Sequence, residues 1–305
     1  MSISLSGILT KEASEMRYAS SLRKILTEER TLLVPGAYDA FSAKILKQAG
    51  FKVIYMSGSA VTASLTGLPD VGFLTMTEMV NRARDIVGAI DLPLICDADN
   101  GYGNPINVIR TVREYERAGV AGIHMEDQVA PKRCGHFEGK QIIPAEEMVK
   151  KIEAAIYARE DEAFLLIART DACSVAGLDE ALKRARLYSE AGADMIFVES
   201  PQSVDELTKI SETLSHVPLL VNMVEGGKTP TLPFEDLQKM GFKIVLYPTS
   251  TIRAVAKTLQ ELASHLYKVG YTKDFESRLV TFEGRNQITG LSHIKELEER
   301  FVKIK

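Results

Sequence analysis

The sequence of 305 residues predicts an α/β protein, a TIM-type (β/α)8 barrel followed by a helical C-terminal extension. Two observations predict this fold class. Short apolar runs of β-branched and aliphatic residues recur along the chain, as in parallel strands that are buried on both faces. Between these runs lie segments whose apolar residues are three and four positions apart, as in amphipathic helices.

The expected strands are, in chain order, TLLVPG, KVIYMSG, LPLICDAD, GIHMED, FLLIARTDA, MIFVES, PLLVNM and KIVLYP. The clearest helical segments between them are NPINVIRTVREYERAG, PAEEMVKKIEAAIYARE and LDEALKRARLYSEAG. Gly50, Gly119, Gly192 and Gly241 stand just before a strand and predict left-handed helix C-caps. Eight strand and helix units in this length favour a closed barrel over the alternative, a doubly wound open sheet.

No linker rich in Pro, Gly or Ser interrupts the alternation, so we expect residues 1–305 to form a single barrel domain. From about residue 260 the pattern is purely helical and ends in SHIKELEERFVKIK. We expect residues 260–305 to form an extension that packs on a neighbouring subunit.

Composition excludes several classes of partner. The chain is 45% hydrophobic and 26% charged, and its net charge of −4 leaves no basic excess for nucleic acid. The start, MSISLSGILTKEASEMR, has no basic region of a leader peptide, and no run approaches the roughly 18 apolar residues of a membrane span. Three cysteines provide no disulfide framework. We therefore expect a cytoplasmic protein without a membrane partner.

Polar side chains follow nearly every expected strand, where a barrel of this type places its active site. Asp97 and Asp99 alternate on the third strand and are expected to point to one face, with Ala98 turned away. Together with Glu126 and Glu199, they predict a site for Mg²⁺, with Mn²⁺ as the alternative. The structural alternative is that one aspartate caps the next helix while the other is solvated.

A cysteine lies between cations in Lys132, Arg133, Cys134, Gly135 and His136, shortly after the fourth strand. Neighbouring cations lower the pKa of a thiol and make it a nucleophile or a fast proton donor and acceptor. The same cations, joined by Arg169 on the next strand, equally suit a polyanionic substrate. The remaining alternative is a surface loop whose cysteine has no role.

Three motifs together resemble one superfamily. The run DADNGYGNPINVIRTVREYERAGVAGIHMEDQVAPKRCGH, the segment ARTDA and the segment YMSGSAVTASLTGLPD closely resemble the isocitrate lyase and phosphoenolpyruvate mutase superfamily, and most of all its 2-methylisocitrate lyases. The resemblance covers nearly the whole chain, and a KRCGH loop after EDQ is specific to the lyase branch.

The resemblance implies a Mg²⁺-dependent carbon–carbon lyase that cleaves 2-methylisocitrate, a small tricarboxylate, to pyruvate and succinate. Such an enzyme serves the methylcitrate cycle in propionate catabolism. The resemblance also implies a homotetramer whose last helix is exchanged between subunits, which would explain the helical tail.

The resemblance also implies residue roles. Asp97 and Asp99 match the metal site, Cys134 matches the catalytic thiol that protonates the departing fragment, and Arg169 and His136 stabilise its charge. Either Tyr55 or Glu126 is expected to remove the hydroxyl proton. The expected substrate-binding residues, with the loop cations included, are Ser57, Gly58, Ser59, Asp70, Lys132, Arg133, Gly135, Glu199, Asn222, Arg253 and Arg285.

The sequence departs from the family pattern at one place and leaves three alternative functions open. The glycine-rich SGGG of the family is Ser57, Gly58, Ser59 and Ala60 here, which narrows the expected carboxylate pocket. The alternatives are an isocitrate lyase, another lyase acting on a 2-alkyl malate or isocitrate-type acid, and a non-catalytic barrel that binds carboxylates.

Overall fold

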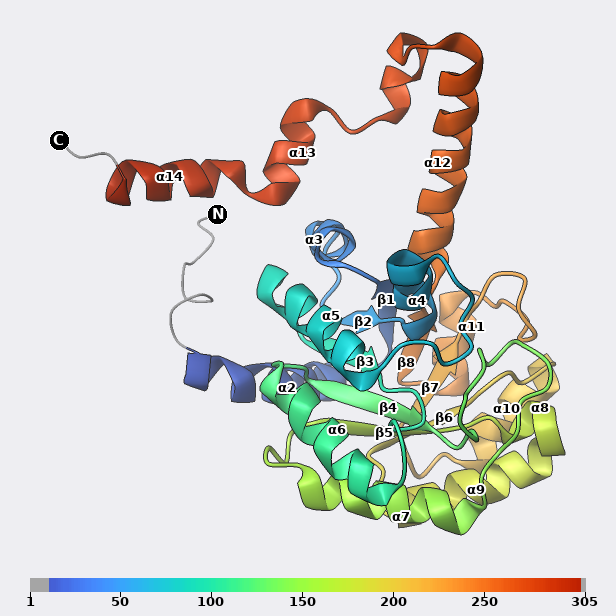
Figure 1. Cartoon of the computed structure of the whole chain (residues 1–305). Coiled ribbons are helices and arrows are strands. Elements are labelled where there is room, and N and C mark those ends of the chain that lie inside the picture. The colour runs from blue at the N-terminus through green and yellow to red at the C-terminus, as the bar shows by residue number, and fades with distance from the viewer. Residues whose placement is uncertain (1–10, 303–305) are drawn as a thin grey trace.

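A computed structural model describes residues 11–302 and shows a closed barrel of parallel strands inside a ring of helices (Figure 1). Residues 1–10 and 303–305 lie outside the described part, and the expectation that the chain starts without a leader peptide falls mostly on the first of these ranges. The strands are β1 Leu32–Ala37, β2 Ile54–Met56, β3 Leu94–Asp97, β4 Gly122–Glu126, β5 Leu165–Thr170, β6 Met195–Val198, β7 Leu219–Asn222 and β8 Ile244–Tyr247.

The sheet closes because β8 pairs in parallel with β1, in the register Leu32 opposite Ile244. All eight expected strands are present in sequence order around the barrel. The barrel prediction is confirmed, and the open-sheet alternative is wrong.

The helices of the barrel follow the strands, as the sequence predicts. They are α3 Ala40–Gln48, α4 Gly58–Thr66, α5 Met76–Ala89, α6 Pro105–Arg117, α7 Ala145–Ala158, α8 Ala172–Ala176, α9 Leu178–Glu190, α10 Val204–Thr213 and α11 Phe234–Met240. The four glycines expected at helix ends have φ values of 96°, 81°, 101° and 96° in chain order, which confirms the left-handed caps.

Two apolar layers hold the barrel together. The larger one lies between the strands and the surrounding helices, and the smaller one fills the barrel interior. Leu22 of α2 (Lys11–Glu28) belongs to the interior layer, and Arg23 Nε donates to the carbonyl of Ala163 at 2.9 Å. This helix was not predicted, because its few apolar residues are interrupted by polar ones such as Ser20 and Ser21.

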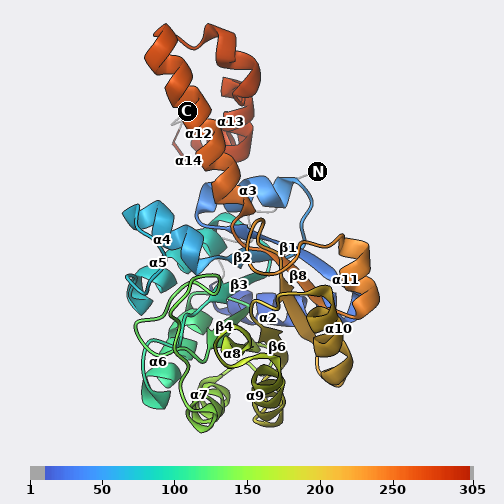
Figure 2. The ribbon, with the colours of Figure 1, turned by 90° about the vertical axis from the view of Figure 1, so that its right-hand side faces the viewer.

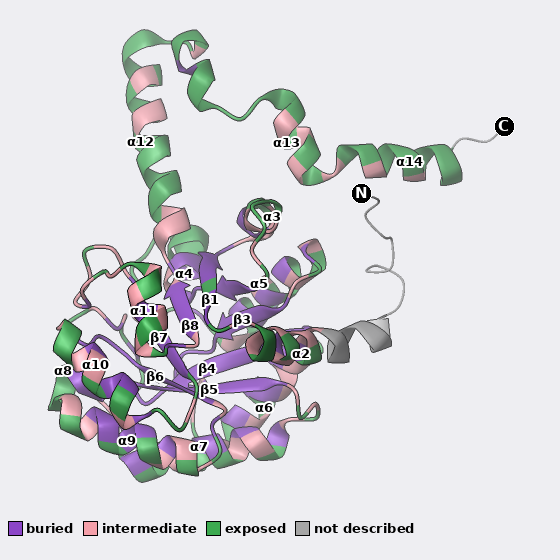
Figure 3. Cartoon of the chain, turned by 180° about the vertical axis from the view of Figure 1, so that it is seen from behind, coloured by how far each residue is buried: buried purple, intermediate pink, exposed green. Residues whose placement is uncertain are grey.

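The C-terminal extension forms an arm of α12 Ser250–Val269, the 3-10 helix η1 Lys273–Arg278, α13 Phe282–Thr289 and α14 Leu291–Phe301. Figures 1 and 2 show α12 rising from the barrel and the rest of the arm turning back over it. The three α-helices of the arm contain no buried residue (Figure 3).

The expected boundary near residue 260 falls inside α12, which begins at Ser250 and contacts β1. Within the arm, α13 contacts α3 of the same chain. Across residues 11–302 there is no helix with both the length and the apolar character that crossing a membrane requires.

Candidate active site

A small cavity of about 60 Å³ lies at the carboxyl ends of the strands. Eleven of the predicted site residues line it. They are Tyr55, Ser57, Ser59, Asp70, Asp97, Cys134, Gly135, His136, Arg169, Glu199 and Asn222. The barrel therefore brings together residues that are more than 150 positions apart in the sequence.

Arg169 at the end of β5 is surrounded by carboxylates. Its Nε lies 2.9 Å from Asp171 Oδ2, and its Nη1 lies 3.3 Å from Glu126 Oε2 and 3.4 Å from Glu199 Oε2. The guanidinium also lies over the ring of Phe197, 5.2 Å from its centroid. Because a buried cation is tolerated only when it is paired, these partners hold Arg169 in one orientation at the cavity wall.

Cys134 lies in the segment between β4 and α7 that we call the cysteine loop, residues 130–140. Its backbone N–H donates to the carbonyl of Asp70 at 3.0 Å. Burial, followed by the carboxylate of Asp70, raises the pKa of the Cys134 thiol to about 11. The thiol is therefore protonated at neutral pH, which suits a proton donor.

The sequence-based expectation of a lowered pKa for this thiol is wrong in its net direction, because burial outweighs the lowering effect of Lys132. Arg133 is exposed, and Lys132 Nζ instead lies 2.9 Å from both Asp70 Oδ1 and Asp99 Oδ1. Adjacency in the sequence does not place the two charges at the sulfur, so the effect of burial dominates.

Gly135 and His136 bring the cysteine loop against the opposite wall of the cavity. A Cβ at Gly135 would lie 2.6 Å from both Arg169 Nη2 and Glu199 Cγ, so any larger residue would push the loop away. The backbone N–H of Lys228 donates to His136 Nδ1 at 3.1 Å, and His136 Nε2 lies 3.6 Å from Glu199 Oε1. Burial lowers the pKa of His136.

Tyr55 has a buried partner that sequence reasoning missed. Its hydroxyl lies 2.6 Å from His124 Nε2, and the two rings are stacked. Burial lowers the pKa of His124 to about 4, so the imidazole is neutral at physiological pH. A signal was available, because His124 stands two positions before Glu126 on β4 and so shares its face of the strand.

The two aspartates expected to coordinate a metal are both buried, but in different backbone settings. Strand β3 ends at Asp97, and Asp99 has a φ of 46°, so the two do not simply alternate along one strand. Asp97 accepts from the backbone N–H groups of Gly58 at 3.2 Å and Asp99 at 3.0 Å. Burial, only partly offset by Lys132, raises the pKa of Asp99 to about 6.

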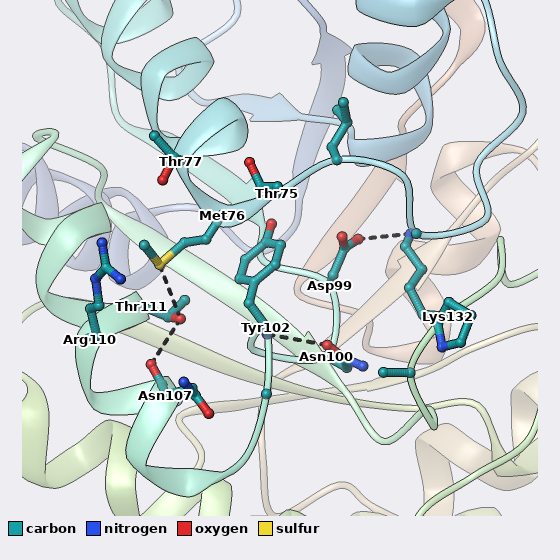
Figure 4. Close-up of a pocket in the computed structure, with 15 residues that line it drawn as sticks. Thr75, Met76, Thr77, Asp99, Asn100, Tyr102, Asn107, Arg110, Thr111 and Lys132 are labelled. Carbon is teal, nitrogen blue, oxygen red and sulfur yellow. Dashed lines mark hydrogen bonds and ion pairs between the residues drawn. The ribbon is translucent and has the colours of Figure 1, made fainter.

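Asp99 borders a second and larger cavity of about 470 Å³ (Figure 4) and does not line the small one. In Figure 4 the ammonium of Lys132 meets the Asp99 carboxylate at one side, and the ring of Tyr102 lies between them and the side chains of Thr75 and Met76. The Asp99 and Lys132 pair therefore lines this open cavity, and Lys132 is connected to the small one through its other partner, Asp70.

Five predicted substrate-binding residues do not line the small cavity. Gly58 and Lys132 contact the lining residues Asp97 and Asp70, respectively, and the other three are arginines. The Arg133 side chain is exposed, and Arg253 on α12 is 52% exposed and pairs with Glu225 Oε2 at 3.1 Å. Arg285 on α13 lies over the ring of Phe282 in the arm. Their roles, like those of the lining residues, stay predictions.

A family model described as phosphoenolpyruvate phosphomutase matches residues 22–267, well over half of the chain. The chain belongs to the phosphoenolpyruvate mutase and isocitrate lyase superfamily. Among curated superfamily members, 2,3-dimethylmalate lyase of Eubacterium barkeri is 47% identical over 286 residues, which are 94% of this chain and 99% of that protein. The 2-methylisocitrate lyase of Bacillus subtilis (strain 168) is 44% identical over 270 residues, 88% of each.

Solved superfamily structures agree with the fold. A crystal structure of 2,3-dimethylmalate lyase superposes with a TM-score of 0.86 at 35% identity, covering 92% of this chain and 94% of that one. Phosphonopyruvate hydrolase in complex with oxalate and Mg²⁺ superposes with a TM-score of 0.85 at 31% identity, covering 93% and 99%. Members of the superfamily thus include lyases, hydrolases and mutases, and the particular reaction depends on the site.

The residues of this superfamily member fit a divalent cation, although within residues 11–302 no three His, Cys, Asp or Glu side chains form a ready cluster for one. Mg²⁺ commonly uses one or two carboxylates and keeps several waters. Asp97 and Asp99 supply two, and both oxygens of the buried Glu126 lack a hydrogen-bond partner. A cation would compete with Lys132 for Asp99, because the ammonium now lies against that carboxylate.

Sequence reasoning also missed the residues behind the cavity. Asp127 accepts from Thr170 Oγ1 and from the backbone N–H of Asp171, each at 2.8 Å, and pairs with Arg184 at 3.1 Å. Asp171 in turn pairs with Arg169 and with Lys140. Their motifs, EDQ and RTD, are visible in the sequence, but only the fold shows that they meet.

Proposed function

We propose that this chain is a divalent-metal-dependent carbon–carbon lyase that cleaves a 2-hydroxy acid and protonates the departing fragment with Cys134. The observation that supports this most directly is a thiol with a pKa of about 11 in the same small cavity as Asp97 and Arg169. A protonated thiol beside a fixed cation suits acid catalysis on a carbanionic fragment. It does not suit a nucleophile, which needs thiolate.

Asp97 and Asp99 would hold Mg²⁺, with Mn²⁺ as the alternative. The bound cation would supply Lewis acidity, lowering the pKa of the substrate hydroxyl and fixing the adjacent carboxylate. Glu126 is the better of the two proposed bases. Burial raises its pKa well above the ordinary value, which makes the carboxylate a stronger base, and both its oxygens are free of hydrogen bonds.

Tyr55 suits a different role. Burial raises the pKa of the Tyr55 phenol well above its ordinary value, so the phenolate needed for a base is disfavoured. Its hydroxyl, held by His124, orients the substrate hydroxyl instead. Glu126 takes the proton, the bond between C2 and C3 breaks, and the electron pair passes to the fragment that carries C3.

That fragment is an aci-carboxylate with added negative charge. Arg169, His136 and the backbone of the cysteine loop stabilise it, since fixed donors in a closed site need no reorganisation as charge develops. Cys134 gives its proton to C3, and the proton held by Glu126 returns to the thiolate through solvent before the next turnover.

We propose 2-methylisocitrate as substrate, cleaved to pyruvate and succinate in propionate catabolism. The 47% identity to 2,3-dimethylmalate lyase favours a second candidate, 2,3-dimethylmalate, which the same bond cleavage converts to pyruvate and propionate. The two acids differ only in a carboxymethyl or a methyl group on C3. Isocitrate, which would yield glyoxylate, is the third acid to compare.

The deciding experiment measures product release from all three acids with the same preparation, first with Mg²⁺, then with EDTA, then with Mn²⁺ restored. Because the methyl group that separates 2-methylisocitrate from isocitrate is worth only about 1–3 kcal/mol, the ratio of kcat/KM values decides, not activity alone. Preference for 2-methylisocitrate supports the first proposal. Preference for 2,3-dimethylmalate keeps the mechanism and replaces the substrate. Absence of product from every acid, or activity that survives EDTA, contradicts the proposed function.

The remaining expectations stay predictions. They are a homotetramer with an exchanged helix, substrate contacts from Arg133, Arg253 and Arg285, and a cytoplasmic location. Membership of an enzyme superfamily disfavours the non-catalytic barrel.

A further inference from the structure

Lys140 ends the cysteine loop with a buried ion pair to the barrel. Its Nζ lies 2.7 Å from Asp171 Oδ1, and the side chains are 2% and 0% exposed. A lysine is rarely buried this completely, and losing such a partner would leave Asp171 less compensated. The ion pair that attaches the loop to the barrel is therefore not screened by water.

The same ammonium reaches back within the loop. Lys140 Nζ also donates to the carbonyl oxygen of Gly135, the residue after Cys134, and Ser200 Oγ donates to that oxygen at 3.0 Å. A single side chain thus fixes the residue next to the thiol, although it stands six positions after Cys134.

Asp171 connects this attachment to the cavity wall. Its Oδ1 accepts from Lys140 and, at 3.1 Å, from Arg169 Nη2, while its Oδ2 accepts from Arg169 Nε at 2.9 Å. Although burial opposes ionisation of Asp171, Arg169 and Lys140 together hold its pKa below the ordinary value. One carboxylate therefore sets the loop and the substrate-facing arginine relative to each other.

Lys140 does not line the cavity, so it has no direct contact to offer a substrate. We infer that Lys140 is a positioning residue that holds Cys134 at its working position over the cavity, through Asp171 and the Gly135 carbonyl. The expected loss of kcat rests on the proposed function. The expected displacement of Cys134 does not.

The loop also offers a matched control. Glu138 and Lys228 form another ion pair on this loop, at 2.6 Å, but the Glu138 side chain is 86% exposed. Exposed pairs contribute little, because water and salt screen them and two flexible side chains must be ordered. If any ion pair on the cysteine loop could hold Cys134 in place, loss of the Lys140 pair and loss of the Glu138 pair would have the same effect.

The experiment compares wild type, Lys140→Met and Glu138→Gln in the full chain. The first readout is the rate of Cys134 alkylation by iodoacetamide, followed on its peptide by mass spectrometry because Cys96 and Cys173 are also free. The second is kcat and KM for the acid that the wild type cleaves.

We expect Lys140→Met to raise the alkylation rate at least about tenfold and to lower kcat at least about tenfold, with KM changed by less than about threefold. Glu138→Gln should stay within about twofold of wild type in both readouts. Lys140→Met behaving like Glu138→Gln overturns the inference, as does faster alkylation with unchanged kcat.

If Lys140→Met does not fold, Ser200→Ala removes the other donor to Gly135 O, together with the contact of Ser200 Oγ to Glu199 Oε1 at 3.1 Å, and leaves every charged side chain in place. It should raise the alkylation rate at least about threefold, and an unchanged rate contradicts the inference. A wild type that cleaves none of the acids refutes the proposed function, while the alkylation comparison still tests the position of the loop.

Discussion

Cys134 illustrates how single residues acquire their chemistry in this protein. Its sequence neighbours are cations, yet its pKa is raised by burial and by Asp70. Lys132 is directed to Asp70 and Asp99 instead of to the sulfur. A thiol in this setting is an acid and not a ready nucleophile, which decides the role that we assign to it.

Replacing Cys134 with serine should lower kcat about a hundredfold to ten-thousandfold, because a hydroxyl is a much weaker acid than the thiol. Binding of oxalate with Mg²⁺, measured by calorimetry, should change little, because the wall around Arg169 is intact. Oxalate is the ligand named for two structural relatives. Cys173→Ser is the matched control, since Cys173 is buried beside Glu206 and does not line the cavity. Near-normal turnover of Cys134→Ser would show that another group is the acid.

At the scale of elements, the site depends on how β4, β5 and α9 are joined. Asp127 follows β4, is fully buried, and accepts from Tyr188 of α9 at 2.8 Å as well as from the residues at the end of β5. The backbone hydrogen bonds of parallel strands do not involve side chains. The Asp127 carboxylate therefore adds a side-chain link between β4, β5 and α9, next to Asp171 and behind the cavity.

Asp127→Asn should lower the free energy of unfolding by about 3–5 kcal/mol, because it removes the fully buried charge partner of Arg184 and leaves only the partly exposed Glu180. Urea unfolding followed by circular dichroism measures the change. Asp179→Asn removes an ion pair with Lys209 in which the aspartate side chain is 90% exposed, and should cost at most about 1 kcal/mol. Equal effects for the two variants would mean that the Asp127 network is not a structural link.

At the scale of the whole molecule, the arm is the feature that a single chain leaves unexplained. Phe282 is 75% exposed, Tyr267 93% and Phe301 68%, all within residues 250–302. Apolar side chains gathered on a projecting segment are typical of a surface that another subunit covers. The arm therefore supports the proposed exchange between subunits.

A chain ending at Gly270 should form a smaller assembly than the full chain, because it lacks α13 and α14. We expect light scattering to give the full chain a mass near four times the 33.6 kDa of one subunit. Circular dichroism should show that the barrel of the truncated chain remains folded. A full chain that runs as a monomer would contradict the tetramer.

Much of the fold was predictable from the sequence because it follows from local patterns. Buried parallel strands appear in the sequence as continuous apolar runs, and the helices between them appear as apolar residues three and four positions apart. All eight strands were therefore predicted. Helix α2 was missed because its pattern is weak, although the barrel buries Leu22 completely. The polar residues that end or follow the strands, including Asp97, Cys134 and Arg169, were equally visible.

The sequence by itself determined the barrel, the superfamily and most residues at the mouth, since residue type and spacing specify these features. Only the tertiary structure decided which charges face each other. Lys132 is directed to Asp99, Lys140 and Arg169 share Asp171, and the thiol is left protonated. The physical reason is that pairing and desolvation depend on distances of a few ångström and on exclusion of water, and neither is encoded by adjacency along the chain.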